Sequence, residues 1–389
     1  MFSEGILQIL TILNLLGAAQ GLFMALLVLS MKSANRKASI LLATLLFCFS
    51  MSIGGATLGV SGYYLRFPHL IRVGDPFVLL LGPLFYLYAR SLARYPLRPK
   101  ELLHFVPFLV YVLSLIPFFA GTATEKIAFV QQMQESRSAG IIVIVVLRLV
   151  FLLAYSVITY RFLQTYTARI KENFSNIDKL NLDWLIAVSK LLLLVIVCSV
   201  GMYVLILFSK LSFLESNYIN AFLVSLVIYA VGFLGVRQSR VFAAAPLPVS
   251  TAIPVSIEPA ETKPATKYEN STLSQEKSSR YLQKLLHSMQ QDKLYLDSEL
   301  SLQTLADKLS IPPHYLSQVI NEQLGQNFFD FVNTYRVEEV KSRLTDPKNQ
   351  HLTILAIAFD AGFNSKSAFN LAFKSITGFT PSQFRTQHK

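Results

Sequence analysis

The apolar first 240 residues of this 389-residue chain contain few side chains that can do chemistry. Asp75, Arg148 and Lys190 are the ionisable residues that lie deepest within long hydrophobic stretches. A carboxylate and a guanidinium held inside a membrane can face a polar ligand, so Asp75 and Arg148 are candidate polar sensor residues. A purely structural pair between two helices, or a position near the membrane edge, explains them equally well. Lys190 lies near the end of its stretch, where its long side chain can reach the interface as an anchor.

The motifs of enzymatic chemistry are absent from the sequence. It has no Gly-x-Ser-x-Gly, no His-Glu-x-x-His, no phosphate-binding glycine loop and no paired carboxylates within its apolar stretches. Cys48 and Cys198 both lie in apolar runs and are typical of small buried residues rather than of a disulfide or a metal site. We therefore expect no catalytic residues, no metal and no cofactor, and a protein that is not an enzyme.

Composition places the elements that carry these residues in a membrane. Hydrophobic residues make up 53% of the chain and its mean hydropathy is +0.46, whereas an ordinary soluble domain is about 45–50% apolar. Pro83 and Pro107 interrupt two of the apolar segments, which membrane helices tolerate where neighbours satisfy the freed carbonyls. We predict an all-α chain that begins with a seven-helix transmembrane bundle over residues 1–240. The segments long enough to cross a bilayer, which takes about 20 residues, are 6–30, 38–60, 74–93, 102–120, 140–163, 184–209 and 217–236.

Basic residues in the loops between these segments predict the orientation of the bundle, because loops rich in Lys and Arg stay in the cytoplasm. One alternating set of loops carries Lys32, Arg36, Lys37, Arg94, Arg98, Lys100, Arg161, Arg169, Lys171, Lys179, Arg237 and Arg240. The other set carries only Arg66, Arg72, Lys126, Arg137 and Lys210. With seven spans, we expect the N-terminus outside and the C-terminus in the cytoplasm.

Residues 241–272 separate the apolar region from the rest of the chain. They contain five prolines and show neither helical nor strand periodicity. Proline-rich tracts of this kind form extended, semi-rigid spacers. We predict a linker here, followed by a soluble domain over 273–389, in which 13 basic and 11 acidic residues give a mixed surface.

The soluble domain contains one design twice. "LADKLSIPPHYLSQVINEQLG" (305–325) and "IAFDAGFNSKSAFNLAFKSITG" (357–378) each predict a first helix with a small inward residue, a turn, and an amphipathic second helix that stops at glycine. Two short helices joined by a tight turn are typical of a helix-turn-helix motif. Gly362 suits a turn that needs a positive φ, Ser365 can cap the helix behind it, and Pro313 suits a first helical position.

These motifs resemble the C-terminal DNA-binding domain of the AraC/XylS transcription regulators. The resemblance covers residues 273–389, about 30% of the chain. Its most specific part is "IAFDAGFNSKSAFNLAFKSITGFTPSQFR", with the Gly-Phe, Ser, Phe, Phe-Lys, Gly and Thr-Pro landmarks of the family, and "FFDFVNTYRVEEVKSRL" (328–344) matches the helix that connects the two motifs. The resemblance implies two recognition helices that enter successive major-groove segments on one face of DNA, about one helical turn or 34 Å apart.

The resemblance also implies which polar side chains face the bases. Gln and Asn can pair bidentately with adenine and Lys with guanine, whereas Lys374 is placed for a phosphate contact. An alternative is that these residues form only the solvated faces of two amphipathic helices. The base-facing candidates are His314, Ser317, Gln318 and Asn321 in the first recognition helix, and Lys366, Ser367 and Asn370 in the second.

The domain departs from the family pattern in ways that weaken a single DNA-binding tail. Leu371 and Gln318 stand where the family usually has basic residues, and the net charge over 273–389 is only +2. Because phosphate neutralisation supplies much of the affinity for DNA, a homodimer in the membrane would help by raising the effective concentration of tails. The expected partners are double-stranded promoter DNA, the lipid bilayer, a second copy of the chain, an unknown small-molecule or envelope signal and, for an activator, RNA polymerase.

Sequence and resemblance together predict a one-component transcription regulator embedded in the bacterial cytoplasmic (inner) membrane. Its membrane domain would sense an envelope or membrane signal, and its C-terminal domain would bind DNA in the cytoplasm. The alternative function is a membrane transporter, or another membrane protein, with a regulatory DNA-binding tail, because transport needs very few polar groups.

Overall fold

The computed structural model describes residues 4–33, 35–135, 139–178, 180–208, 213–237 and 273–388. The named elements in these ranges are all helical, as the sequence predicts, and one isolated bridge pairs Phe174 with Ser301. The predicted linker, residues 241–272, lies outside the described residues. The chain forms two units, one of Met1–Gln164 with Leu182–Val255 and the other of Thr165–Asn181 with Ser256–Lys389.

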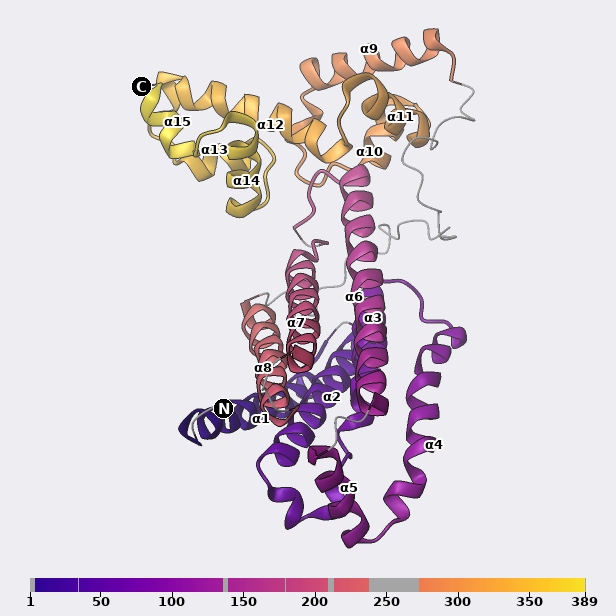
Figure 1. Ribbon diagram of the computed structural model, residues 1–389. Coiled ribbons are helices and arrows are strands. Elements are labelled where there is room, and N and C mark those ends of the chain that lie inside the picture. Colours follow the sequence, from indigo (N-terminus) through magenta and orange to yellow (C-terminus); the bar gives the residue numbers. More distant parts are fainter. Residues whose placement is uncertain are drawn as a thin grey trace. The chain divides into compact units, whose positions relative to one another are not determined.

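The first unit is built from long apolar helices (Figure 1). Helix α2 is central to its packing, because α1, α3 and α8 all contact it. Leu46 and Ile53, on the buried side of α2, are each 1% exposed. The helices are α1 (Glu4–Ser30), α2 (Arg36–Val60), α3 (Val78–Leu92), α4 (Val106–Ala120), α5 (Ala123–Glu135), α6 (Ala139–Asn173), α7 (Asp183–Phe208) and α8 (Phe213–Arg237), of which α6 continues into the second unit.

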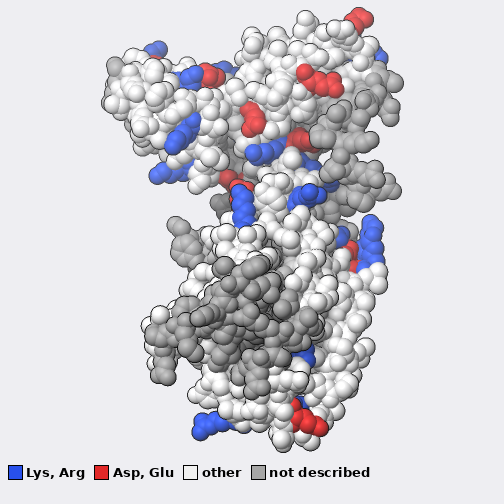
Figure 2. All heavy atoms as spheres, viewed as in Figure 1, with Lys and Arg blue, Asp and Glu red and all other residues white. Residues whose placement is uncertain are grey.

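Within the part of the chain that the structure describes, six helical segments are long and apolar enough to cross a membrane. Large apolar side chains such as Phe23, Leu102 and Leu113 are more than 60% exposed on them, a surface that lipid accepts and water does not. The face drawn in Figure 2 shows few charged atoms over these helices. The predicted seventh segment falls in α8, whose apolar run among the described residues, Tyr218–Val231, is shorter. The six are Gly5–Ser30, Arg36–Gly59, Pro68–Leu92, Pro99–Ala120, Val143–Asn173 and Asp183–Val204.

Prolines mark changes in the helices of the first unit. Pro83 lies inside α3, as expected for an interruption of the third segment. Pro107 lies in the first turn of α4, directly after a 3-10 helix over Pro99–Phe105, so it marks the start of the regular helix rather than a break within it. The proline inside α4 is Pro117.

Helix α5 is not predicted by the pattern of apolar segments. Its start carries a local signal, because the backbone N–H of Thr122 donates to the Glu125 carboxylate over 2.7 Å and the N–H of Glu125 donates to the Thr122 hydroxyl over 3.3 Å. This reciprocal pairing is a capping box. The Thr-x-x-Glu spacing therefore indicates a helix that amphipathic periodicity alone does not reveal.

Seven α-helices, α9 to α15, form the described part of the second unit after residue 272 (Figure 1), and they pack around two hydrophobic cores. One core surrounds Leu305 and Leu316, and the other surrounds Ile357 and Phe373; all four side chains are fully buried. Helix α12 contributes to both cores and therefore joins the two halves rigidly. The helices are α9 (Gln275–Gln291), α10 (Leu302–Leu309), α11 (Pro313–Leu324), α12 (Phe328–Thr345), α13 (Ile354–Asp360), α14 (Lys366–Thr377) and α15 (Pro381–Gln387).

Candidate nucleic-acid interface

The first helix-turn-helix motif is formed by α10 and α11. Helix α10 starts with a capping box in which Ser301 and Thr304 satisfy each other's backbone N–H groups. It ends at Ser310, whose φ of 51° turns the chain in the left-handed region. Pro313 occupies the first turn of α11, as predicted, and Gly325 ends that helix with φ 64°.

The second motif, formed by α13 and α14, has the predicted turn and cap. Gly362 has φ 96°, a conformation that residues with a side chain rarely adopt. The Ser365 hydroxyl accepts a hydrogen bond from the backbone N–H of Ala368 over 3.1 Å and so caps α14. Gly378, with φ 79°, ends the helix. The local sequence therefore encodes where α14 begins and where it ends.

Helix α14 presents an exposed polar face. Phe369 and Phe373 anchor its other side in the core, with 1% and 0% exposure. Leu371, which stands where a basic residue was expected, is 72% exposed beside the polar residues. The predicted residues that lie exposed on this helix are Lys366, Ser367, Asn370 and Lys374.

Helix α11 presents its predicted residues less uniformly. His314 is exposed, and Ser317 and Asn321 are half-buried. Gln318 is only 7% exposed, and its side-chain amide donates to the Glu322 carboxylate over 3.0 Å. Of the four side chains predicted to face bases from this helix, Gln318 is therefore the most enclosed.

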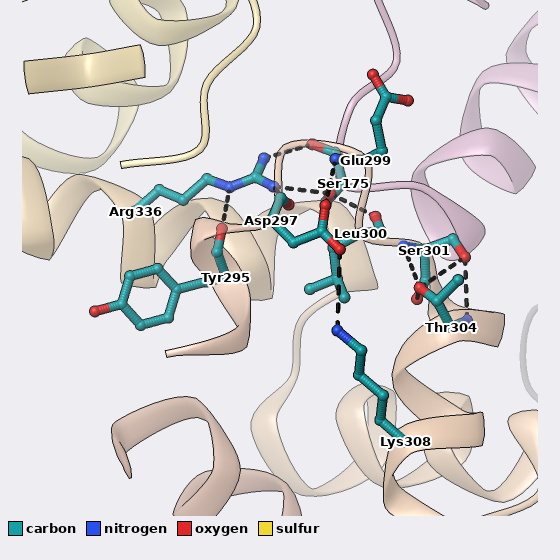
Figure 3. A network of polar contacts seen from close by, with 9 residues as sticks. All are labelled: Ser175, Tyr295, Asp297, Glu299, Leu300, Ser301, Thr304, Lys308 and Arg336. Carbon is teal, nitrogen blue, oxygen red and sulfur yellow. Dashed lines mark hydrogen bonds and ion pairs between the residues drawn. The ribbon is translucent and has the colours of Figure 1, made fainter. Parts of the chain in front are cut away.

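A buried arginine that the sequence analysis did not single out lies on α12. Arg336 is 1% exposed, and its guanidinium makes hydrogen bonds to backbone carbonyls on two sides (Figure 3). Its Nε donates to the Tyr295 carbonyl over 2.8 Å, and one terminal nitrogen donates to the Asp297 carbonyl over 2.8 Å. These bonds fasten the loop before α10 to the connecting helix.

Ser175, in the segment that follows α6, completes this network within the second unit (Figure 3). The Arg336 guanidinium donates to the Ser175 hydroxyl over 3.0 Å and to its carbonyl over 3.2 Å. The Ser175 hydroxyl in turn donates to the Leu300 carbonyl over 2.6 Å. Every polar group of Ser175 is therefore used, since its backbone N–H also donates to Leu300 over 3.2 Å.

The turn of the second motif closes the same network. A Cβ added to Gly362 would lie 2.6 Å from the Tyr295 carbonyl oxygen and 2.9 Å from the Arg336 Nε. The Arg336 guanidinium also lies 5.8 Å from the centre of the Phe363 ring. Arg336 therefore sits where the two helix-turn-helix halves meet.

Burial and charge act in opposite directions on the groups around this junction. Burial lowers the pKa of Arg336 to about 10, partly offset by the carboxylates of Asp297 and Glu299. For Glu339 on the same helix, burial favours the neutral acid, but hydrogen bonds from Arg343, Lys293 and Tyr295 outweigh it and hold its pKa below the usual range. Helix α12 therefore carries a guanidinium whose charge is disfavoured by burial and a carboxylate whose charge is stabilised by its neighbours.

The polar residues predicted within the first unit lie close together. Arg148 approaches the Asp75 carboxylate to 3.6 Å, and Arg72 donates to the same carboxylate oxygen over 3.2 Å. Tyr111 accepts hydrogen bonds from both arginines. Arg72 lies three residues before Asp75, so their contact is local, whereas the approach of Arg148 to Asp75 depends on the fold and cannot be read from spacing.

Among the described residues, no group of three or more His, Cys, Asp or Glu side chains is arranged to hold a metal ion.

A family model described as a helix-turn-helix domain matches residues 305–387. An uncharacterised HTH-type transcriptional regulator of Staphylococcus aureus (strain COL) is 37% identical over 92 residues, which cover 24% of this chain and 12% of that protein. The regulator YtdP of Bacillus subtilis (strain 168), also uncharacterised, is 30% identical over 93 residues, with the same coverage of both chains. The chain thus spans about 12% of the length of the curated relatives it matches.

Two solved structures are similar to the same part of the chain. The C-terminal domain of AraT, a response regulator from Geobacillus stearothermophilus, is 30% identical and covers 30% of this chain and 88% of its own, with a TM-score of 0.24. A protein of unknown function from Listeria innocua is also 30% identical, covers 28% and 97%, and has a TM-score of 0.25.

The fold and the matched residues assign the C-terminal part of the chain to a class of DNA-binding domains. Its C-terminal domain is an AraC-type helix-turn-helix domain, in which the matched range 305–387 contains both motifs and the helix between them. The preceding region contributes the six long apolar helices, which are suggestive of membrane spans.

Proposed function

We propose that this chain is a membrane-embedded, one-component transcription regulator whose C-terminal domain binds promoter DNA sequence-specifically. The exposed polar face of α14 carries the proposal, because Lys366, Ser367 and Asn370 project from a helix that Phe369 and Phe373 fix in the core. Base pairs differ at the major-groove edge in their hydrogen-bond donors and acceptors, so a rigid helix with such side chains can distinguish them.

Helix α11 is proposed as the second recognition helix. Its accessible polar groups are those of His314, Ser317 and Asn321. Gln318 contributes when its side-chain amide breaks the hydrogen bond to Glu322 and bonds a base instead. Helix α12 packs into both cores and so sets the separation of α11 and α14 for two successive major-groove segments. Lys374, exposed on α14, is placed for a phosphate.

The membrane domain is proposed to span 1–240, the linker 241–272 and the DNA-binding domain 273–389. The six long apolar helices support insertion into the bacterial inner membrane, and α8 is proposed as the seventh span. The distribution of Lys and Arg over the loops supports a cytoplasmic C-terminus, which DNA binding requires. Pairing of two copies in the membrane would bring two tails together on one promoter.

Sensing is proposed to act through the segment Thr165–Asn181. This segment continues α6 along the chain and packs in the same unit as the helix-turn-helix motifs, where Ser175 contacts Arg336. A signal that withdraws Ser175 leaves a buried guanidinium without two of its acceptors, and the junction between the motifs must then rearrange. Two states with different contacts are what an allosteric switch requires.

Chromatin crosslinking with sequencing, on cells that express the full-length protein, tests the DNA-binding function. We expect discrete promoter sites that disappear in the double variant Lys366→Glu, Asn370→Ala, with both proteins present in the membrane at equal levels. Sites that persist in the double variant, or the absence of sites for the unaltered protein under every condition tested, would contradict the proposal. The second result would favour the alternative function, a membrane transporter.

A further inference from the structure

The first unit contains a partly open cavity of about 840 Å³ that the proposed DNA binding does not involve. It lies among helices α2, α3, α6, α7 and α8, and apolar side chains such as Phe49, Ile53 and Leu149 make up most of its lining. Small-molecule pockets in proteins measure about 300–1,000 Å³ and combine an apolar lining with a few placed polar groups. The cavity therefore has the size and composition of a ligand site.

One end of the cavity is positively charged. Arg72, Asp75 and Arg148 are the charged residues of its lining. The Asp75 carboxylate lies 3.2 Å from the Arg72 Nε and 3.6 Å from a terminal nitrogen of Arg148, so one carboxylate faces two guanidinium groups. The described lining thus holds one positive charge that no acidic residue of the lining balances.

One hydrogen-bond donor of Arg148 is also unsatisfied. Its guanidinium lies 4.7 Å from the centre of the Tyr111 ring and donates to the Tyr111 hydroxyl through a terminal nitrogen. Its Nε is buried and has no hydrogen-bond partner among the described residues. A buried donor without an acceptor is unfavourable, and a small shift of the Arg148 side chain would turn it to an oxyanion in the cavity.

We propose that this cavity binds an amphiphile with one anionic headgroup, a carboxylate or a phosphate, and one apolar chain. The headgroup accepts from the Arg148 guanidinium and neutralises the excess positive charge, since guanidinium groups match the geometry of these oxyanions. The apolar chain occupies the remainder of the cavity. This inference rests on the proposed function only for its consequence, which is that the bound amphiphile is the signal that the membrane domain senses.

Native mass spectrometry of the full-length protein in a neutral detergent tests this binding without DNA. The probes share one chain length: dodecanoate, dodecyl phosphate, dodecanol and dodecyltrimethylammonium. We expect at least one anion to bind about tenfold more tightly than the alcohol, as one charge-assisted hydrogen bond allows, and the cation to bind most weakly. A further arm with dioleoyl phosphatidylglycerol distinguishes a two-chain bilayer lipid from a single-chain amphiphile. Equal binding of anions, alcohol and cation, or binding of none, would overturn the proposal.

Variants locate the site in the cavity. Arg148→Gln should reduce the affinity for the anion to that for dodecanol, whereas Lys190→Gln, which removes a membrane charge outside the lining, should leave it unchanged. Val224→Trp, which fills the apolar part, should weaken every probe. Gel filtration and circular dichroism verify that each variant folds. Should Arg148→Gln not fold, the selectivity of the unaltered protein among the probes decides alone, and its outcome does not depend on DNA binding.

Discussion

Ser175 and Arg336 are 161 residues apart in the sequence and share two hydrogen bonds, one to the serine hydroxyl over 3.0 Å and one to its carbonyl over 3.2 Å (Figure 3). The same guanidinium holds the loop before the first helix-turn-helix motif through Tyr295 and Asp297, and it borders the turn of the second at Gly362. A segment that follows the apolar helix α6 is thereby joined to the point where the two DNA-binding halves meet. We infer that this junction is where a membrane signal reaches the DNA-binding domain.

Replacing Ser175 with alanine should loosen this junction. The change removes an acceptor for Arg336 and a donor to Leu300, and we expect a local loss of about 1–2 kcal/mol. Hydrogen exchange of the full-length protein in nanodiscs should become faster in α12 and in the loop before α10. Ser279→Ala, an exposed serine on α9, is the matched control and should change nothing. Unaltered exchange in the Ser175 variant would contradict the role given to this contact.

The two positive-φ glycines of the second motif, Gly362 in its turn and Gly378 at the end of α14, should respond very differently to alanine. Gly362→Ala places a methyl group 2.6 Å from the Tyr295 carbonyl oxygen in addition to straining a φ of 96°, so we expect a loss above about 2 kcal/mol and loss of DNA binding. Gly378→Ala meets no atom within 4 Å and should cost only the backbone strain at φ 79°, about 1 kcal/mol. Hydrogen exchange measured over a denaturant titration gives the loss of stability in both variants. Equal losses would show that the close approach at Gly362 does not matter.

Lys374 should contribute to the salt dependence of DNA binding rather than to its sequence preference. A lysine on a phosphate adds about one unit to the slope of log affinity against log salt. Lys374→Ala should therefore reduce that slope by about one and weaken all sites alike. Lys277→Ala, an exposed lysine on α9, should leave the slope unchanged. Fluorescence anisotropy with labelled operators at several salt concentrations distinguishes the two, and a change in relative site preference for Lys374→Ala would contradict the assignment.

Glu339 should make the stability of helix α12 depend on pH. Its folded pKa lies below the unfolded value of about 4.3, because hydrogen bonds from Arg343, Lys293 and Tyr295 stabilise the carboxylate against the opposing effect of burial. The stabilisation is therefore fully present above the unfolded pKa and is lost as the pH falls through the folded pKa.

Glu339→Gln tests that dependence. It should destabilise α12 at pH 7 by about 1 kcal/mol, since its partners Lys293 and Arg343 are 48% and 30% exposed, and the difference should shrink below about pH 4. Glu338→Gln is the control, because Glu338 is 55% exposed and forms an ion pair with Lys341 three residues along the helix. Local stability from hydrogen exchange at pH 7 and pH 4 gives the comparison. A constant difference between Glu339→Gln and the unaltered protein at both pH values would contradict the pKa direction.

Features with local causes were predictable from the sequence. Gly325, Gly362 and Ser365 occupy the turn and cap positions that their backbone angles and hydrogen bonds favour, and these angles and bonds involve atoms a few residues away. The long apolar helices were predictable for the same reason, because hydropathy is summed over neighbouring residues. The capping box of Thr122 and Glu125 is as local as these and identifies α5 once it is sought.

Features that depend on tertiary packing were not predictable. Arg336 lies in the amphipathic segment "YRVEEVKSRL", where it is typical of a solvated cation, yet it is 1% exposed. Its acceptors come from two distant segments, so no spacing within the helix reveals them. Gln318 likewise follows the polar periodicity of a recognition helix but is 7% exposed beside Glu322. Periodicity reports which face of a helix is polar, and only the fold determines which polar residues remain accessible.

The most direct test of the account is a footprint of the full-length protein in nanodiscs on an operator recovered by crosslinking. We predict two protected major-groove segments about one helical turn apart. Asn370→Ala on α14 should weaken protection of one segment, and Asn321→Ala on α11 should weaken the other. A single protected segment, or variants on α11 and α14 that both affect the same segment, would contradict the claim that two recognition helices joined by α12 bind the promoter.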